Sequence, residues 1–320
     1  MIAIEDVSRR FGDTLAVDGV SLTVAAGSVT VLVGTSGSGK STLLRMINRL
    51  IAPSAGRILI DGRDTATVPG EELRRGIGYV IQGYGLFPHW TVARNIATVP
   101  TLLGWDAARI RRRIEELLRL FELDPGLYAG KLPHELSGGQ QQRVGVARAL
   151  AAEPKLLLMD EPFGALDPII RAKAQDDLAA LQRRLGITIV LVTHDMAEAI
   201  RLGDRIGVMD GGRLLQYAPP AELLARPAPG FAARLLGGRD RPFQLLSLQT
   251  VGAALGDAAP GVAPATGSDV APVRDGDTLR DALAELLWRR ADSLPVVGAD
   301  GAPRGRIALA DILRRAGPPA

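Results

Sequence analysis

Short apolar runs alternate with longer helical patterns along the chain up to about residue 236. The runs at 28–33, 155–159 and 187–192 are apolar almost throughout, as strands buried on both faces of a sheet tend to be. Glycines punctuate these runs, and helical patterns separate them. This order is typical of an α/β fold in which helices flank a central sheet.

One helical pattern and one hairpin pattern stand out within this region. Residues 106–121 carry apolar side chains at helical spacing, and the arginines between them are expected to form a solvated face. The apolar positions are Ile110, Ile114, Leu117, Leu118 and Phe121. Residues 205–217 read as two strands joined by Asp210, Gly211 and Gly212, which predicts a β-hairpin.

The pattern changes after residue 236. Residues 251–276 are rich in Ala, Gly and Pro and show little periodicity, which predicts a linker or a loosely ordered segment. The stretch 278–316 then reads as a helix, two strands and a helix. This unit is too small to bury much apolar surface alone, so we expect it to pack against a partner surface.

Composition narrows the class of protein. The chain has 320 residues, enough for one large domain or two unequal ones. Its 38 basic and 35 acidic residues are interleaved, and no basic stretch is combined with stacking aromatics, so nucleic acid is not an expected partner. The chain has no cysteine, which excludes disulfides, thiolate catalysis and cysteine-ligated metals.

The apolar runs also bear on location. The first residues lack the basic-then-apolar order of a signal peptide, and the longest apolar runs have the length of strands rather than of membrane spans. We therefore expect a cytoplasmic chain. Any action at a membrane would require another polypeptide to cross it.

A glycine-rich loop follows the first apolar run and precedes a helical pattern. It fits the G-x-x-x-x-G-K-[ST] phosphate loop in the strand-to-helix setting that the motif requires. The loop comprises Gly34, Thr35, Ser36, Gly37, Ser38, Gly39, Lys40, Ser41 and Thr42. Its backbone N–H groups and the helix start favour phosphate. Lys40 is expected to neutralise the β- and γ-phosphates of a nucleotide, and the Ser41 hydroxyl to ligate Mg²⁺.

Two carboxylates follow the run at 155–159. Asp160 and Glu161 are expected at the carboxyl edge of a parallel sheet, where ligands of α/β folds bind. Asp160 can hold the Mg²⁺ shell, and Glu161 can orient and polarise the attacking water. Adjacent strand residues point to opposite sides, so we expect the two carboxylates to have different roles.

A histidine follows the run at 187–192. That run lies one helix past the strand of Glu161, so His194 should reach the same sheet edge. There it can hydrogen-bond the γ-phosphate or the water. His89 and His134 have no such setting and are expected to be structural.

With these residues in place, the chain resembles the ATP-binding subunit of an ABC transporter over residues 1–236. The resemblance implies a phosphate-loop ATPase cassette of α/β class, with an antiparallel β subdomain and a helical subdomain, and it implies ATP and Mg²⁺ as cofactors. It also implies that Phe11 stacks on adenine and that Gln82 ligates Mg²⁺ and senses the γ-phosphate. Asp167 would lie in the loop that crosses to a partner subunit, and His194 would be the switch histidine.

A second glycine-rich stretch has no lysine. Its residues are Leu136, Ser137, Gly138, Gly139 and Gln140. They resemble the family signature, which implies that two copies pair head to tail, with each ATP between the phosphate loop of one copy and the signature of the other. Ser137 and the following amides can donate to the γ-phosphate without a lysine, because Lys40 of the other copy supplies the cation.

The stretch 72–100 is similar to subunits that serve glycine betaine, choline and related quaternary-amine osmoprotectants, and the lead-in to the signature resembles bacterial importers. In the family, the segment Gly83–Asn95 meets cytoplasmic helices of the membrane subunit. Phe87 and Trp90 would be its buried anchors, and ordinary core aromatics are the alternative. The implied partners are transmembrane permease subunits and, indirectly, a substrate-binding protein, with this chain peripheral on the cytoplasmic face of the inner membrane.

The tail resembles part of the CBS modules found behind osmoprotectant importer cassettes. The resulting domain plan is a cassette over 1–236, a linker over 237–272 that could include a truncated CBS stump, and one small α+β CBS-like motif over 273–320. Only one complete copy is legible, so we hypothesise that two tails pair across the dimer, with Asp311 near any ligand ribose. We expect the tail to have a regulatory role; the alternative is that it is purely stabilising or vestigial.

The main prediction is therefore the ATP-hydrolysing subunit of an importer for glycine betaine or another quaternary amine. The alternative in the same class is an importer ATPase for another small polar solute, such as an amino acid. A soluble ABC protein of translation or DNA repair predicts two cassettes or a long coiled-coil insertion, and the sequence shows neither. A nonhydrolysing regulator predicts loss of Glu161 or His194, but both are present.

Overall fold

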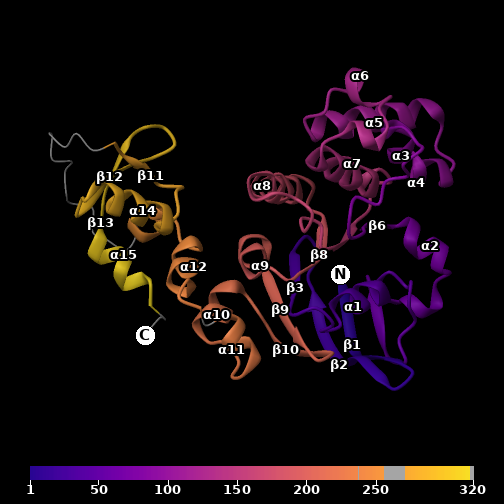
Figure 1. The fold of residues 1–320 in the computed structure, drawn as a ribbon, viewed down its shortest axis with the longest axis horizontal. Helices are drawn as coiled ribbons and strands as arrows, with labels where there is room; N and C mark the ends of the chain where they lie inside the picture. The colour runs from indigo at the N-terminus through magenta and orange to yellow at the C-terminus, as the bar shows by residue number, and fades with distance from the viewer. Residues whose placement is uncertain (237, 256–270, 318–320) are drawn as a thin grey trace. The chain divides into compact units, whose positions relative to one another are not determined.

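The computed structural model describes residues 1–236, 238–255 and 271–317. The chain forms two compact units, the first over Met1–Tyr217 and the second from Ala218 onward (Figure 1). The first unit thus ends before residue 236, where the sequence pattern placed the end of the cassette. The difference arises because two short helices that follow Tyr217 group with the second unit.

A six-stranded sheet forms the centre of the first unit, in the order β10-β9-β3-β8-β7-β6. Its strands are β3 (Val29–Val33), β6 (Ile77–Val80), β7 (Leu156–Asp160), β8 (Thr188–Thr193), β9 (Arg205–Asp210) and β10 (Arg213–Ala218). The neighbours from β9 to β6 pair in parallel. Every residue of β3, β7 and β8 is buried, which confirms the three predicted strands.

The predicted hairpin is confirmed as well. Strands β9 and β10 are neighbours in the sheet, and the turn between them contains Gly211 and Gly212 at φ 52° and φ 82°. Positive φ values suit glycine because it has no Cβ. The turn therefore follows directly from the sequence.

A smaller antiparallel sheet packs beside the central one, in the order β2-β1-β4-β5. Its strands are β1 (Ile2–Phe11), β2 (Thr14–Val24), β4 (Ala55–Ile60) and β5 (Arg63–Asp64). One buried cluster joins apolar residues of β1, β2 and β4 with those of helix α1 (Lys40–Ile47) and of β7 and β8. The helix that follows the phosphate loop therefore packs against both sheets.

Helices make up the rest of the first unit. They are α2 (Gly70–Arg75), α3 (Val92–Ile96), α4 (Thr98–Leu102), α5 (Ala107–Leu120), α6 (Pro125–Tyr128), α7 (Gly138–Leu150), α8 (Pro168–Leu185) and α9 (Met196–Leu202), with 3₁₀ turns at Thr65–Thr67 and Pro133–Glu135. Figure 1 shows α3 to α7 gathered as a helical group apart from β1 and β2. Helix α5 confirms the helix predicted over 106–121, with Leu117 and Leu118 buried.

The described residues of the second unit form nine elements. They are α10 (Pro220–Ala225), α11 (Phe231–Leu236), α12 (Arg241–Ser247), α13 (Val251–Leu255), β11 (Val273–Arg274), α14 (Leu279–Arg289), β12 (Ser293–Val297), β13 (Pro303–Ala308) and α15 (Leu309–Arg315). The helix, strand, strand, helix order predicted for 278–316 is present. Strand β12 pairs in parallel with β11 and antiparallel with β13.

Part of the segment predicted as a linker is helical. Leu246 of α12 and Val251 and Ala254 of α13 are buried in one cluster with residues of α14, α15 and the three strands. These helices form because a three-stranded sheet exposes an apolar face that needs cover. Residues 237 and 256–270 of the predicted linker lie outside the described residues.

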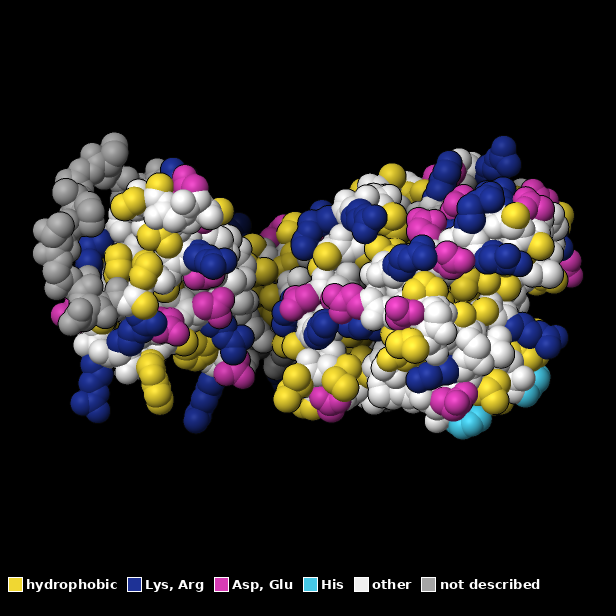
Figure 2. Space-filling view, turned by 90° about the horizontal axis from the view of Figure 1, so that it is seen from above, with side chains coloured by type: hydrophobic (Ala, Val, Ile, Leu, Met, Phe, Trp, Pro, Cys, Tyr) yellow, Lys and Arg dark blue, Asp and Glu magenta, His cyan; other side chains and the backbone are white. Residues whose placement is uncertain are grey.

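The charged side chains on the surface are mixed, as the nearly balanced numbers of basic and acidic residues suggest. Figure 2 shows Lys and Arg side chains interleaved with Asp and Glu over the face that it presents. Among the described residues, no helix is both long enough and apolar enough to cross a bilayer.

Candidate active site

The phosphate loop turns the chain sharply from β3 into α1. Gly39 has φ 97°, and a Cβ there would lie 2.4 Å from the carbonyl oxygen of Ala16. A Cβ on Gly34 would lie 2.1 Å from the carbonyl oxygen of Met209. Both positions therefore require glycine for close backbone approach. Backbone amides of such a loop can bind phosphate oxygens; in this loop the Ser38 N–H donates to the carbonyl oxygen of Thr35 at 3.2 Å.

The Lys40 side chain lies inside this loop. Only 5% of the residue is exposed, and its ammonium donates hydrogen bonds to the carbonyl oxygens of Gly34 (2.8 Å) and Thr35 (2.7 Å) and to Ser38 Oγ (3.2 Å). Burial lowers the pKa of Lys40, and the negative charges of Glu161 and Asp160 oppose this shift. Phosphate oxygens would compete with the loop carbonyls for the same ammonium.

Ser41 and Asp160 meet across the sheet edge. The Ser41 hydroxyl donates to Asp160 Oδ1 at 2.7 Å, and Asp160 is 3% exposed. A hydroxyl and a carboxylate oxygen at one point form the kind of hard donor set that Mg²⁺ prefers. The structure therefore brings together two of the three predicted metal ligands.

The third predicted ligand is placed less closely. Gln82 follows β6, and β6 pairs with β7 with Val80 opposite Met159, so Gln82 lies at the same carboxyl edge as Asp160. Its side chain is exposed, and within the described ranges it makes no hydrogen bond to Ser41 or Asp160. A role as ligand would require the loop after β6 to move inward.

Glu161 and His194 approach each other at this edge. Glu161 Oε2 lies 3.3 Å from His194 Nδ1, with side-chain exposures of 22% and 61%. Glu161 has φ 46°, and its N–H donates to the carbonyl oxygen of Val192 at 2.9 Å. Strand β7 ends at Asp160, so this left-handed turn, rather than strand alternation, separates Glu161 from its neighbour.

Phe11 and Asp167 lie at exposed ends of elements. Phe11 closes β1, is 44% exposed, and has the guanidinium of Arg9 4.5 Å from its ring centroid. Asp167 caps α8 by accepting the N–H groups of Ile169 and Ile170, each at 3.1 Å. An open aromatic face can stack on a base, and an exposed cap can contact a second chain.

The signature stretch opens α7. Ser137 and Gln140 form a capping box, in which Ser137 N–H donates to Gln140 Oε1 at 2.9 Å and Gln140 N–H to Ser137 Oγ at 3.3 Å. Leu136 is buried, whereas Ser137 is exposed. Helix α7 belongs to the helical group, apart from α1 (Figure 1). The chain therefore presents the signature separately from its own phosphate loop.

The sequence did not predict that the loop after β6 contacts helix α7. A Cβ on Gly138 would lie 2.5 Å from the Tyr84 hydroxyl, and Arg148 donates to the carbonyl oxygen of Gly85 at 2.6 Å. Burial lowers the pKa of Arg148. The small residues at both surfaces, Gly85 and Gly138, are the signal that was available.

In the segment Gly83–Asn95, Phe87 is exposed and Trp90 is half-buried. The rings of Phe87 and Trp90 lie 4.4 Å apart between centroids, and Phe87 is 39% exposed. Asn95 is fully buried and bonds the backbone of Phe87 and Trp90 at 2.8 to 3.2 Å. The aromatic pair is thus held near the surface by a buried amide rather than packed in the core.

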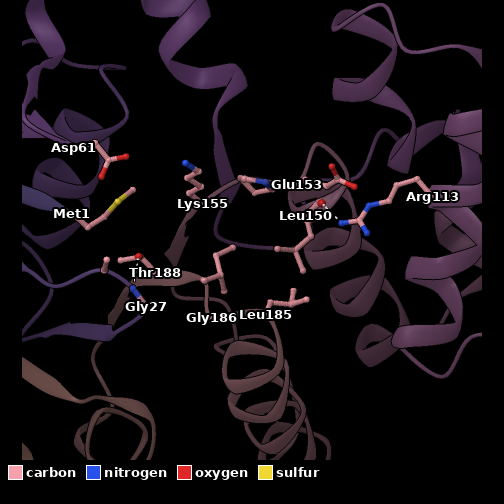
Figure 3. A pocket seen from close by; sticks show the side chains of 13 residues that line it. Met1, Gly27, Asp61, Arg113, Leu150, Glu153, Lys155, Leu185, Gly186 and Thr188 are labelled. Atoms are coloured by element: carbon pink, nitrogen blue, oxygen red, sulfur yellow. Dashed lines mark hydrogen bonds between the residues drawn. The ribbon is translucent and has the colours of Figure 1, made fainter.

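A hollow of about 690 Å³ opens at the opposite edge of the sheet (Figure 3). Lys155, just before β7, and Thr188, the first residue of β8, are among its lining residues, and Figure 3 shows Asp61 and Arg113 at opposite sides of it. It contains none of the predicted site residues. The predicted chemistry instead gathers at the carboxyl edge.

Comparisons with known proteins agree with this geometry. A family model described as ABC transporter matches residues 17–164. The glycine betaine uptake system ATP-binding protein YehX of Escherichia coli (strain K12) is 48% identical over 313 residues, which cover 98% of this chain and 99% of that protein. The osmoprotectant import ATP-binding protein OsmV of Salmonella typhimurium is 51% identical over 257 residues, which cover 79% of this chain and 67% of that protein.

A solved structure is similar to most of this chain. It is the dimeric structure of a post-hydrolysis state of the ATP-binding cassette MJ0796, bound to ADP and Pi. The TM-score is 0.62 and the sequence identity 34%, over 69% of this chain and 99% of that one.

Proposed function

Because this chain belongs to the ATP-binding subunits of ABC transporters, we propose that it hydrolyses ATP between two copies of itself to drive import of glycine betaine or another quaternary-amine osmoprotectant. The observation that carries the proposal is the 48% identity with a glycine betaine uptake subunit over nearly the whole of both chains. A second relative, 51% identical, serves osmoprotectant import. Similarity to these two relatives supports a quaternary-amine substrate over another small polar solute.

The chemistry proposed for the site is hydrolysis of the γ-phosphate. Water attacks the γ-phosphorus, the bond to the β–γ bridging oxygen breaks, and ADP and phosphate leave. Glu161 polarises the water and accepts its proton. His194, 3.3 Å from Glu161, hydrogen-bonds the γ-phosphate, and Lys40 neutralises charge that develops on the phosphates.

Ser41, Asp160 and Gln82 are the residues that would hold Mg²⁺. The 2.7 Å contact between Ser41 and Asp160 supports this assignment, because both offer hard oxygen atoms. The ion would screen the negative charge of the β- and γ-phosphates. Phe11, with its exposed ring, would stack on the adenine.

The second copy supplies the signature. Ser137 is exposed at the start of α7, which lies apart from the phosphate loop of its own chain, and the similar solved cassette is dimeric with bound ADP and Pi. ATP would therefore join Lys40 of one copy to Ser137 of the other. Loss of the γ-phosphate removes the group that both copies contact, so hydrolysis shifts the dimer toward opening.

The membrane partner is a permease that receives the segment Gly83–Asn95. The contact between exposed Phe87 and half-buried Trp90 supports a docking role, because aromatics at a surface commonly anchor interfaces. A substrate-binding protein would act through the permease. The chain itself would be peripheral, on the cytoplasmic face of the inner membrane.

The test is uptake by the reconstituted complex. Permease, binding protein and this chain in liposomes, with ATP inside, should accumulate radiolabelled glycine betaine or choline. Unlabelled quaternary amines should compete for that uptake, and amino acids should not. Uptake that only amino acids abolish would support the other importer class, and absence of ATPase activity in the purified chain would contradict the whole proposal.

A further inference from the structure

One face of helix α7 is formed by two glycines and an arginine. Gly138, Gly145 and Arg148 follow one another at helical spacing, which places them on one side of the helix. A Cβ on Gly138 would lie 2.5 Å from the Tyr84 hydroxyl oxygen, and a Cβ on Gly145 would lie 3.1 Å from the Tyr84 carbonyl oxygen. Tyr84 therefore lies lengthwise along this face, with its side chain directed toward the start of α7.

The contact between Tyr84 and α7 is one of shape. Tyr84 is half-buried, and the glycines leave the space that it fills, since a side chain at Gly138 would clash with its hydroxyl. Within the described part of the chain, that hydroxyl makes no hydrogen bond. Arg148 adds a polar contact on the same face by donating to the carbonyl oxygen of Gly85 at 2.6 Å. Close packing of this kind resists displacement.

This contact joins two segments that the proposed function uses. Tyr84 lies two residues after Gln82, in the segment Gly83–Asn95 that is proposed to meet the permease. Gly138 directly follows Ser137, which caps α7 by accepting the N–H of Gln140 at 3.3 Å. A shift of the start of α7 along Tyr84 therefore moves Ser137 as well.

We propose that Tyr84 is a positioning residue for the signature. Its ring fills the glycine face of α7 and so fixes Ser137 where ATP on the other copy requires it. Misplacement by about 1 Å can cost roughly 100-fold in rate, so loss of the ring slows turnover although Tyr84 touches no nucleotide. This inference rests on the proposed hydrolysis of ATP between two copies.

The first measurement is ATP binding and turnover by Tyr84→Ala. Its kcat should fall by about tenfold, whereas the Kd for ATP of the single chain should not change, because the phosphate loop binds that ATP. Tyr84→Phe keeps the ring and should retain about half or more of wild-type turnover. Trp105→Ala is the matched control, because it removes a ring that packs on Arg109 at 3.4 Å rather than on α7. Its kcat should match that of the wild type.

Mixed dimers locate the defect. The competing role for Tyr84 is support of Gln82, at the phosphate site of its own chain. If Tyr84 instead acts through the signature, a dimer of Tyr84→Ala with Lys40→Ala has one intact site, and an equal mixture should recover about a quarter of wild-type turnover. With Ser137→Arg, each site contains a defective signature, and the mixture should stay near about a twentieth.

The reverse pattern would overturn the inference, that is, recovery with Ser137→Arg and none with Lys40→Ala. An unchanged kcat in Tyr84→Ala would also overturn it, and so would an equal loss in Tyr84→Phe or in Trp105→Ala.

Arg148→Met is the second variant if Tyr84→Ala folds poorly. It removes the hydrogen bond to Gly85 from the same face of α7, so its mixtures should show the same pattern of recovery. A mixture of Lys40→Ala with Ser137→Arg that recovers no turnover would instead contradict the proposed function. The two failures are therefore distinct.

Discussion

His194 Nδ1 lies 3.3 Å from Glu161 Oε2, although 32 residues separate them in the chain. The contact exists because β7 and β8 are parallel neighbours, with Asp160 opposite Val192, and each strand ends just before one of the two residues. The same edge contains the hydrogen bond from Ser41 to Asp160. The residues proposed as two Mg²⁺ ligands, as the base and as the donor to the γ-phosphate are thus gathered at one edge of the sheet.

Lys40→Ala should lose ATP affinity. Its ammonium is the buried cation of the loop, and charge-assisted contacts to phosphate are strong, so the Kd for ATP should rise by about 100-fold. Titration calorimetry measures this. Lys155→Ala, which removes an exposed lysine at the opposite sheet edge, should bind like the wild type, and a Lys40→Ala chain that also did so would show that the loop does not hold the phosphates.

Ser137→Arg should leave ATP binding by a single chain nearly intact and abolish turnover. The residue is exposed and separate from the phosphate loop, so an arginine there blocks the second copy rather than the first. Nucleotide binding and steady-state phosphate release measure the two effects. Turnover close to that of the wild type would mean that the signature does not contact ATP.

Mixing two inactive variants tests the composite site further. In a dimer of Lys40→Ala with Ser137→Arg, one site contains both defects and the other has neither. An equal mixture should therefore recover roughly a quarter of wild-type turnover if the two sites act independently, since half of the dimers are mixed. A mixture as inactive as its components would contradict a head-to-tail arrangement.

Glu198→Gln should change how stability depends on pH. Burial raises the folded pKa of Glu198 to about 7, above the value of 4.5 for the free acid, so the folded chain binds more protons and loses stability as pH rises between these values. The variant lacks this loss. Its unfolding free energy should exceed that of the wild type by at most about 3 kcal/mol above pH 7, and by almost nothing below pH 4.5.

Urea denaturation at several pH values measures this difference. Glu115→Gln, which changes a half-buried acid paired with Arg119, is the control for a carboxylate-to-amide change elsewhere in the chain. A constant difference for Glu198→Gln across the range would mean that the buried acid titrates normally.

Removal of residues 241–320 should separate catalysis from regulation. The cut precedes α12 and so removes the whole apolar cluster of the second unit, which begins at Leu246. We expect ATPase activity of the cassette to persist and the response of transport to ionic strength to disappear. Uptake and its salt response that match those of the full chain would instead indicate a stabilising or vestigial tail.

The predicted cassette fold is confirmed by the solved cassette and by the sheet order. The sequence could indicate the phosphate loop and the shared edge of Asp160, Glu161 and His194, because these depend on local motifs and on parallel strand order. The left-handed turn at Glu161 was not predictable, since positive φ at a glutamate is imposed by its surroundings.

Two other features could not be predicted from local sequence patterns. The burial of Glu198 could not be predicted from the sequence. The residue lies in the first turn of α9, just after the capping Asp195, where an acid normally faces solvent. Helices α12 and α13 could not be predicted, since their stretch of sequence shows only weak periodicity. Tertiary burial rather than intrinsic propensity stabilises such short helices. The CBS-like character of the tail and the roles of the site residues remain predictions.

The most direct test of the central claim is Glu161→Gln with ATP and Mg²⁺. Light scattering after size exclusion should give the mass of a dimer, because ATP is bound between two copies and not consumed, while phosphate release falls by about 1,000-fold. The wild type without nucleotide should be a monomer. A Glu161→Gln chain that stays monomeric with ATP, or hydrolyses it near the wild-type rate, would contradict an ATP-joined dimer with Glu161 as its base.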